Sequence, residues 1–206
     1  MRRYNLFMLL AALILPVSAA YAVPMTFVGT LSGANEIPPN NSLGTGFASV
    51  VLDPTAETIQ VNVTFSGLGT PTTAAHIHCC LAFPFQPVNV GVATTVPAFP
   101  GFPLGGTSGD YHSAVLSLLD PATYNMTPNT GFLAMFGGNV SLAAAALISG
   151  IENEETYLNI HTSQFPGGEI RTFLVPAPEP TSLILLASAF VGFGLIWRRK
   201  LTAARG

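Results

Sequence analysis

Positive charge is almost absent from the middle of this sequence. Only one of its seven basic residues, Arg171, lies between residues 23 and 177, whereas nine of its ten acidic residues do. One base against nine acids gives this segment a formal net charge of about −8, compared with −3 for the whole chain. A surface of that sign repels phosphate groups, which argues against nucleic acid or anionic lipid as a partner and favours cationic partners or metal ions.

Long hydrophobic runs are missing from the same segment, because the apolar excess of the chain is concentrated at its two ends. At the N-terminus, Arg2 and Arg3 precede an apolar run over 6–17 and the small residues around Ala22. This order predicts a signal peptide over 1–22, removed by signal peptidase. An uncleaved anchor is the alternative, but the run is shorter than the roughly 20 residues that a membrane span needs.

At the C-terminus, a proline-rich spacer leads into an apolar segment over 181–197 and a basic tail over 198–206. Roughly 17 apolar residues are the lower limit for a transmembrane helix, and the basic residues after it favour the cytoplasmic side. We therefore expect a transmembrane helix at 181–197, with the domain at 23–177 outside the membrane. A plain single-pass anchor is one alternative interpretation of this pattern.

Cysteine is scarce, and the two cysteines, Cys79 and Cys80, are adjacent. Their Cα atoms are therefore about 3.8 Å apart, below the usual minimum of about 4.4 Å for a disulfide. An exported dithiol nevertheless meets an oxidising environment. Three interpretations stay open: a vicinal disulfide, metal ligation by Cys80, and free or intermolecular thiols.

Short strands dominate the middle of the chain, and no repeat of solenoid length is present. The clearest strand covers 58–66, where apolar and polar residues alternate with the period-2 pattern of a half-buried strand. Residues 81–109 are rich in Pro, Gly and Phe, which predicts a long ordered loop with its phenylalanines packed against the body. Residues 139–151 have the Ala and Leu density of a short helix. These elements predict an all-β sandwich or barrel with one short helix.

Histidine is also rare, with four in the chain. His76 and His78 share one face of a predicted strand, with Cα atoms about 6.5 to 7 Å apart, so both imidazoles can reach one ion. His161, on a later strand, would complete a three-histidine site. His112 and Cys80 are further candidates, as a fourth ligand and as a thiolate ligand on the same strand face. The competing interpretation is a structural face whose rings bond to backbone carbonyls.

Arg171 has two candidate partners for an ion pair within the domain. Glu169 lies two residues before it on the same predicted strand, and Glu36 lies in a turn near the start of the domain. A bidentate contact would fasten the first turn to the last strand. A structural role is expected for these residues, because nothing in the sequence places the carboxylates across a substrate-sized gap.

The C-terminal segment resembles a known sorting signal. Pro178, Glu179 and Pro180, followed by a hydrophobic stretch and an arginine cluster, are similar to the PEP-CTERM signal of Gram-negative bacteria. The resemblance covers 178–206. It implies recognition and cleavage by an exosortase, transient membrane insertion, and delivery to the cell envelope, outer surface or extracellular matrix.

The domain at 23–177 resembles the CHRD domain, an extracellular module. The segments "FVGTLSGANEIPP", "AAHIH" and "YLNIHTSQFPGGEIR" occur in the order of that family. A looser similarity links the His-x-His strand, the later histidine and the following arginine to the copper/zinc superoxide dismutases. It implies a Greek-key β-sandwich, copper ligands at His76, His78 and His161, and Arg171 beside an open coordination position. A zinc loop and an intersheet disulfide have no counterpart in this chain.

Together these features predict an exported CHRD module of the cell surface or extracellular matrix, acting without catalysis and binding copper or zinc through three histidines. An extracellular polysaccharide or another matrix component would be its partner. Two alternatives stay open: a copper redox enzyme of superoxide-dismutase type and a purely structural matrix protein.

Overall fold

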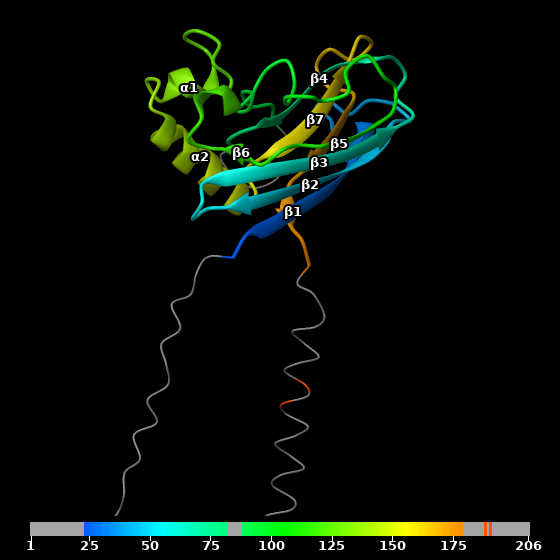
Figure 1. Cartoon of the computed structure of the whole chain (residues 1–206). Coiled ribbons are helices and arrows are strands. Elements are labelled where there is room, and N and C mark those ends of the chain that lie inside the picture. Colours follow the sequence, from blue (N-terminus) through cyan, green and yellow to red (C-terminus); the bar gives the residue numbers. More distant parts are fainter. Residues whose placement is uncertain (1–22, 82–87, 179–187, 189, 191–206) are drawn as a thin grey trace, which may run out of the picture.

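A computed structural model describes residues 23–81 and 88–178, together with 188 and 190 (Figure 1). The predicted signal peptide lies outside the described residues. So does the predicted sorting signal over 178–206, apart from residues 178, 188 and 190. Among the described residues, none of the helices is both long enough and apolar enough to cross a membrane.

Nine strands form one antiparallel sheet, which confirms the predicted all-β class. The strand order is β4-β7-β8-β1-β2-β3-β5, with β6 paired to β3 and β9 paired to β1. Figure 1 shows the sheet curling along the body, with α1 and α2 at one end. The strands are β1 (Met25–Ser32), β2 (Thr45–Asp53), β3 (Thr58–Ser66), β4 (Thr72–His78), β5 (Gly109–His112), β6 (Leu116–Ser117), β7 (Tyr157–Thr162), β8 (Ile170–Phe173) and β9 (Val175–Pro176).

Strand β3 shows why the alternating sequence forms a half-buried strand. Its apolar residues, including Ile59 and Val61, are fully buried in the core, whereas Gln60 and Asn62 between them are partly exposed. The strand pairs with β2 over its whole length, from Thr58 opposite Asp53 to Ser66 opposite Thr45. The predicted period-2 pattern is therefore confirmed at this strand.

Helix α2 (Val140–Glu152) confirms the one helix predicted from the sequence. Its first turn is capped by Asn139, whose side-chain oxygen accepts a hydrogen bond from the Leu142 backbone N–H at 3.2 Å. The structure adds three shorter elements that the sequence pattern did not indicate: η1 (Gly33–Asn35), η2 (Pro121–Thr123) and α1 (Phe132–Met135). Each spans only three or four residues, too few to produce a clear periodicity.

The proline-rich segment before β5 is a loop in its described part, 88–108, as predicted. It is tied to β4 by isolated bridges between Ala75 and Ala98 and between His78 and Val92. Phe99 and Phe102 are buried in the core. The loop is therefore packed against the body through its aromatic residues.

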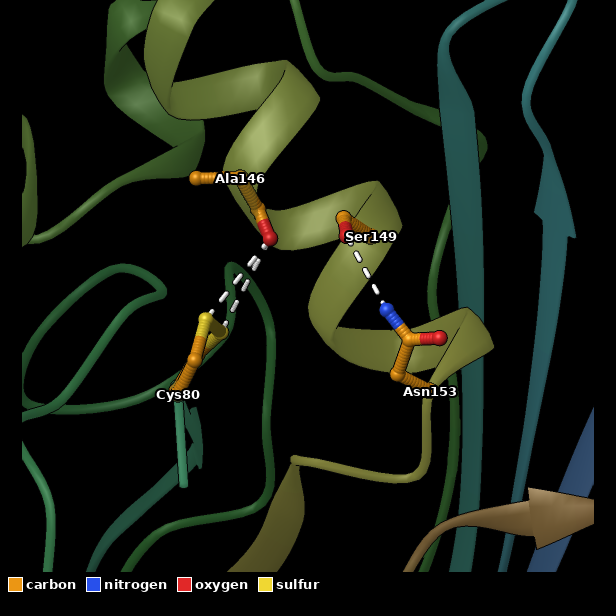
Figure 2. The surroundings of a disulfide bond; sticks show 5 residues. Cys80, Ala146, Ser149 and Asn153 are labelled. Carbon is orange, nitrogen blue, oxygen red and sulfur yellow. Dashed lines mark hydrogen bonds between the residues drawn. A yellow bond between two sulfur atoms is a disulfide. The ribbon is translucent and has the colours of Figure 1, made fainter. Parts of the chain in front are cut away.

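Cys79 and Cys80 form a disulfide directly after β4, and it packs on α2. Figure 2 shows both sulfur atoms beside the carbonyl oxygen of Ala146, and the Cys80 sulfur lies 3.6 Å from it. At Gly150, one turn further along the helix, an added Cβ would lie 2.5 Å from Cys79 Sγ and 2.8 Å from Cys80 Sγ. The absence of a side chain at this position lets the helix approach the disulfide closely.

Replacement of Gly150 with alanine is expected to destabilise the protein. Alanine is favoured over glycine in a helix interior by about 1 kcal/mol, but here its methyl group would collide with two sulfur atoms. Overpacking of this kind costs about 1–3 kcal/mol. Equilibrium unfolding in urea measures the net effect.

The matched control introduces Gly150→Ala together with Cys79→Ala and Cys80→Ala. Without the sulfur atoms the new methyl group is accommodated, and the change at Gly150 should be neutral or stabilising. A loss of equal size in both backgrounds would show that the disulfide does not limit this position.

Candidate metal centre

The sheet register brings His76, His78 and His161 together. His76 and His78 project from one face of β4, and the pairing of β4 with β7 places Ala74 opposite His161 and His76 opposite Asn159. One nitrogen atom from each ring lies within 4.8 Å of the other two. All three rings are buried, with exposed fractions of 5–8%. With metal–nitrogen bonds of about 2.0 Å, two ligands of one ion lie no more than about 4 Å apart, so the three rings are close enough to share an ion after a small inward movement.

Two of the rings are oriented by backbone carbonyl groups from loops over the sheet. His78 Nδ1 donates to the Val90 carbonyl oxygen at 2.6 Å, and His161 Nδ1 lies 2.9 Å from the Pro166 carbonyl oxygen. A carbonyl oxygen only accepts, so a neutral ring that donates from Nδ1 has its lone pair on Nε2. Metal-binding histidines are typically held in this way, with the second ring nitrogen bonded to a carbonyl or carboxylate.

The free ring nitrogens fit a metal better than they fit a closed hydrogen-bond network. His76 Nδ1 and His78 Nε2 are buried and have no hydrogen-bond partner among the described residues. A buried polar atom without a partner costs about 1–3 kcal/mol, and most such atoms in native proteins are paired. Coordination of an ion would satisfy both nitrogens. The donor set and the unpartnered atoms therefore suit a metal.

Burial keeps the three rings uncharged. It lowers the pKa of His76 to about 2 and the pKa of His78 to about 4, and the neighbouring rings lower both pKa values further. Burial also lowers the pKa of His161, with the Arg171 charge acting in the same direction. Metal ligation requires the neutral imidazole. The cluster is thus in the protonation state that binds a metal throughout the neutral pH range.

Tyr157 lies between the histidines and Arg171. Its ring stacks on His78 with a centroid distance of 4.5 Å, and the Arg171 guanidinium carbon lies 3.9 Å from the centroid of the tyrosine ring. The phenol oxygen accepts a hydrogen bond from the Val90 backbone N–H at 3.2 Å. Tyr157 therefore holds the loop that orients His78 and provides an aromatic surface for the only basic residue of the domain.

Arg171 forms a buried ion pair with Glu36. Arg171 Nη2 lies 3.0 Å from Glu36 Oε2, and the two side chains are 1% and 3% exposed. The same nitrogen donates to Asn89 Oδ1 at 2.5 Å. Burial raises the pKa of Glu36 to about 7, while the Arg171 charge opposes that rise. The pair joins the turn after η1 to strand β8, which is the connection expected from the sequence.

Glu169 does not contribute to that pair, contrary to the expectation from its spacing. Its carboxylate is fully buried and accepts hydrogen bonds from Ser42 Oγ at 2.6 Å, from the Gly69 backbone N–H at 2.8 Å and from Thr162 Oγ1 at 2.5 Å. These donors come from separate segments and engage both carboxylate oxygens. Glu169 therefore connects the end of β7 to the loops that precede β2 and β4.

Two further ligand candidates lie away from the cluster. His112 is exposed on β5, where its ring contacts Asn62 Oδ1 at 2.8 Å and Asp110 Oδ1 at 3.2 Å. Cys80 is bonded to Cys79 and packs on α2, so it has no thiolate to offer. The prediction of His112 as a fourth ligand and that of Cys80 as a thiolate ligand are both wrong, because strand pairing and the disulfide direct these side chains elsewhere.

The sequence patterns did not indicate the carbonyl groups of Val90 and Pro166 or the side chain of Asn89. Backbone carbonyls carry no residue signal, and these three residues lie in loops whose paths depend on the whole fold. The side-chain position of Asn159, on the strand face of His161, could be inferred from the period-2 pattern. Its chemical role could not.

Replacement of Arg171 with methionine should destabilise the protein by about 3–5 kcal/mol, the usual cost of removing one partner from a buried ion pair. The buried Glu36 carboxyl group would have no counter-charge and, without the Arg171 charge that lowers its pKa, would bind a proton more readily. Urea unfolding of the variant and of the unaltered chain measures this difference.

A double variant, Glu36→Gln with Arg171→Met, serves as the control. It removes both charges and should lose less stability than Arg171→Met alone. Equal losses in the two variants would mean that the uncompensated charge is not the source of the effect.

Comparison with known families gives two matches. The model of the CHRD domain matches residues 27–174, and that of the PEP-CTERM protein-sorting motif matches residues 176–200. No curated protein and no solved structure matches the chain. The sorting motif implies processing by an exosortase and export to the surface of a Gram-negative bacterium. The first match covers most of the chain and contains the three histidines and the ion pair, so the chain belongs to the CHRD domain family.

Proposed function

We propose that this protein is a metal-binding module of the bacterial cell surface or extracellular matrix, which holds one copper or zinc ion between His76, His78 and His161. The observation that carries the proposal is the convergence of three neutral, buried imidazoles, two of which have a ring nitrogen without a hydrogen-bond partner among the described residues. His78 already donates its other nitrogen to a carbonyl, and His161 Nδ1 lies beside a second carbonyl, which is the surrounding typical of metal-binding histidines.

The charge of the exported domain supports the same proposal. Seven of its nine acidic residues are exposed or partly exposed, and its single arginine is buried. A surface of uniform negative charge raises the local concentration of cations and accelerates their encounter with the protein. In an extracellular polysaccharide or protein matrix, such a module would collect metal ions from the surrounding fluid.

Binding without catalysis is the function that the environment of the cluster favours. Arg171 is engaged by Glu36, Asn89 and Tyr157 and is 1% exposed, which leaves it poorly placed to attract an anion from solvent. A copper redox enzyme with a Greek-key fold like that of copper/zinc superoxide dismutase is the second candidate, supported by the three-histidine donor set. The third is a structural matrix protein in which the rings only pack.

Metal analysis of the full-length chain should find one zinc or copper ion per protein molecule. The variants His76→Ala, His78→Ala and His161→Ala should each bind the ion at least tenfold more weakly, since each removes one ligand. A metal concentration 100-fold above the dissociation constant should also raise the free energy of unfolding by about 2.7 kcal/mol. Equilibrium dialysis and urea unfolding give these two quantities.

The variant His112→Ala is the matched control, because His112 is exposed and lies outside the cluster. It should bind metal as the unaltered chain does. If neither zinc nor copper binds and neither changes the stability, the structural interpretation replaces this proposal. Turnover of superoxide by the copper-loaded protein would support the enzyme instead.

A further inference from the structure

Both ring nitrogens of His161 face oxygen atoms that accept hydrogen bonds. Nδ1 is 2.9 Å from the Pro166 carbonyl oxygen, and Nε2 is 3.0 Å from Asn159 Oδ1. A neutral imidazole has one N–H, so it can donate to only one of these oxygens. The other nitrogen directs its lone pair at an oxygen lone pair. This arrangement is repulsive unless a cation is shared by the two atoms.

The site around His161 is closed to solvent. The ring is 8% exposed and lies against His76, with a centroid distance of 4.6 Å. A metal ion shared by His161 Nε2 and Asn159 Oδ1 would remove the repulsion between their lone pairs, because both atoms can donate a lone pair to the ion.

The Glu36 carboxyl group lies beside the Asn159 amide. A Cβ atom added at Gly168 would collide with both Asn159 Nδ2 and Glu36 Oε1, so these two atoms lie near the same point. Both atoms are buried, and neither has a hydrogen-bond partner among the described residues. Rotation of the amide would place its oxygen against the carboxylate. The observed orientation avoids that repulsion and directs Oδ1 at His161.

We propose that Asn159 Oδ1 is the fourth ligand of the ion held by His76, His78 and His161. This inference rests on the proposed metal site and completes it. Two ligands of one tetrahedral ion lie about 3.3 Å apart, because each bond is about 2.0–2.1 Å long. The 3.0 Å between Asn159 Oδ1 and His161 Nε2 is close to that separation. Asn159 is fully buried and lies opposite His76 in the strand register, on the same sheet face.

A fourth protein ligand affects which metal the site prefers and whether a coordination position stays open for catalysis. Three imidazole nitrogens with one amide oxygen suit a divalent ion such as Zn²⁺, whereas Cu⁺ prefers sulfur ligands. Sites with four protein ligands are typical of stably held ions, and catalytic sites keep a position open for water or substrate. The centre would therefore hold its ion and not activate a substrate on it.

The full-length chain loaded with Co²⁺, which reports its coordination through visible absorption, tests this inference with azide as an added ligand. The unaltered protein has no open position, so azide should leave its spectrum unchanged. Asn159→Ala should bind Co²⁺ at least tenfold more weakly, and azide should then alter the spectrum. Asn159→Asp retains an oxygen ligand and should bind Co²⁺ more tightly than the alanine variant.

Asn41→Ala is the matched control, since Asn41 is exposed, and it should leave affinity and spectrum unchanged. A spectral change on adding azide to the unaltered protein would overturn the fourth-ligand inference, as would unchanged affinity in Asn159→Ala. The three-histidine site would survive either result, because Co²⁺ would still be bound. Failure of the unaltered chain to bind any of the three metals would overturn the site itself.

Discussion

Strand β7 is buried on both faces, and this constraint organises the rest of the domain. One face carries Leu158 and Ile160 into the hydrophobic core, whereas the other carries Tyr157, Asn159 and His161. A buried polar group without a partner costs about 1–3 kcal/mol, so the polar face is stable only if protein groups or a ligand satisfy it. The carbonyl groups of Val90 and Pro166 provide some of these contacts, to the Tyr157 hydroxyl and to the His161 ring. Two of the described atoms left without partners are ring nitrogens of His76 and His78, and an ion between these rings would satisfy them.

The Arg171–Glu36 ion pair fixes the positions of the groups that lie over this polar face. A buried ion pair adds little net stability compared with apolar packing, but it strongly disfavours any arrangement that separates the charges. Here it fixes the turn after η1 over the sheet, and that turn delivers Glu36 to the side of Asn159. The stack of Arg171 on Tyr157 connects the pair to His78. The only arginine of the domain therefore contributes more to fixing the positions of these groups than to the net stability of the fold.

The sequence was informative where one residue type at a fixed spacing determines the outcome. The period-2 pattern of β3, the helix over α2 and the shared face of His76 and His78 depend on local geometry, and the structure has all three. The approach of His161 to the other two rings depends on the pairing of β4 with β7, which no local pattern contains. The prediction of His161 as a ligand therefore rested on the scarcity of histidine in the chain. Glu169 shows the limit of spacing arguments. It immediately precedes β8, and its carboxylate is held by three donors from other segments.

In the proposed function, attraction and retention of a metal would be carried out by different parts of this domain. The cluster itself contains no anionic ligand, and the charges of Glu36 and Arg171 offset each other, so a divalent ion would bring an uncompensated charge into a buried site. The acidic surface can offset part of that charge only at long range, and salt screens such interactions beyond about 8 Å at physiological ionic strength. Surface charge would therefore govern the rate of encounter, while the buried lone pairs would provide the affinity. In the proposed function, this division accounts for the combination of a strongly acidic exterior with a neutral, imidazole-lined centre.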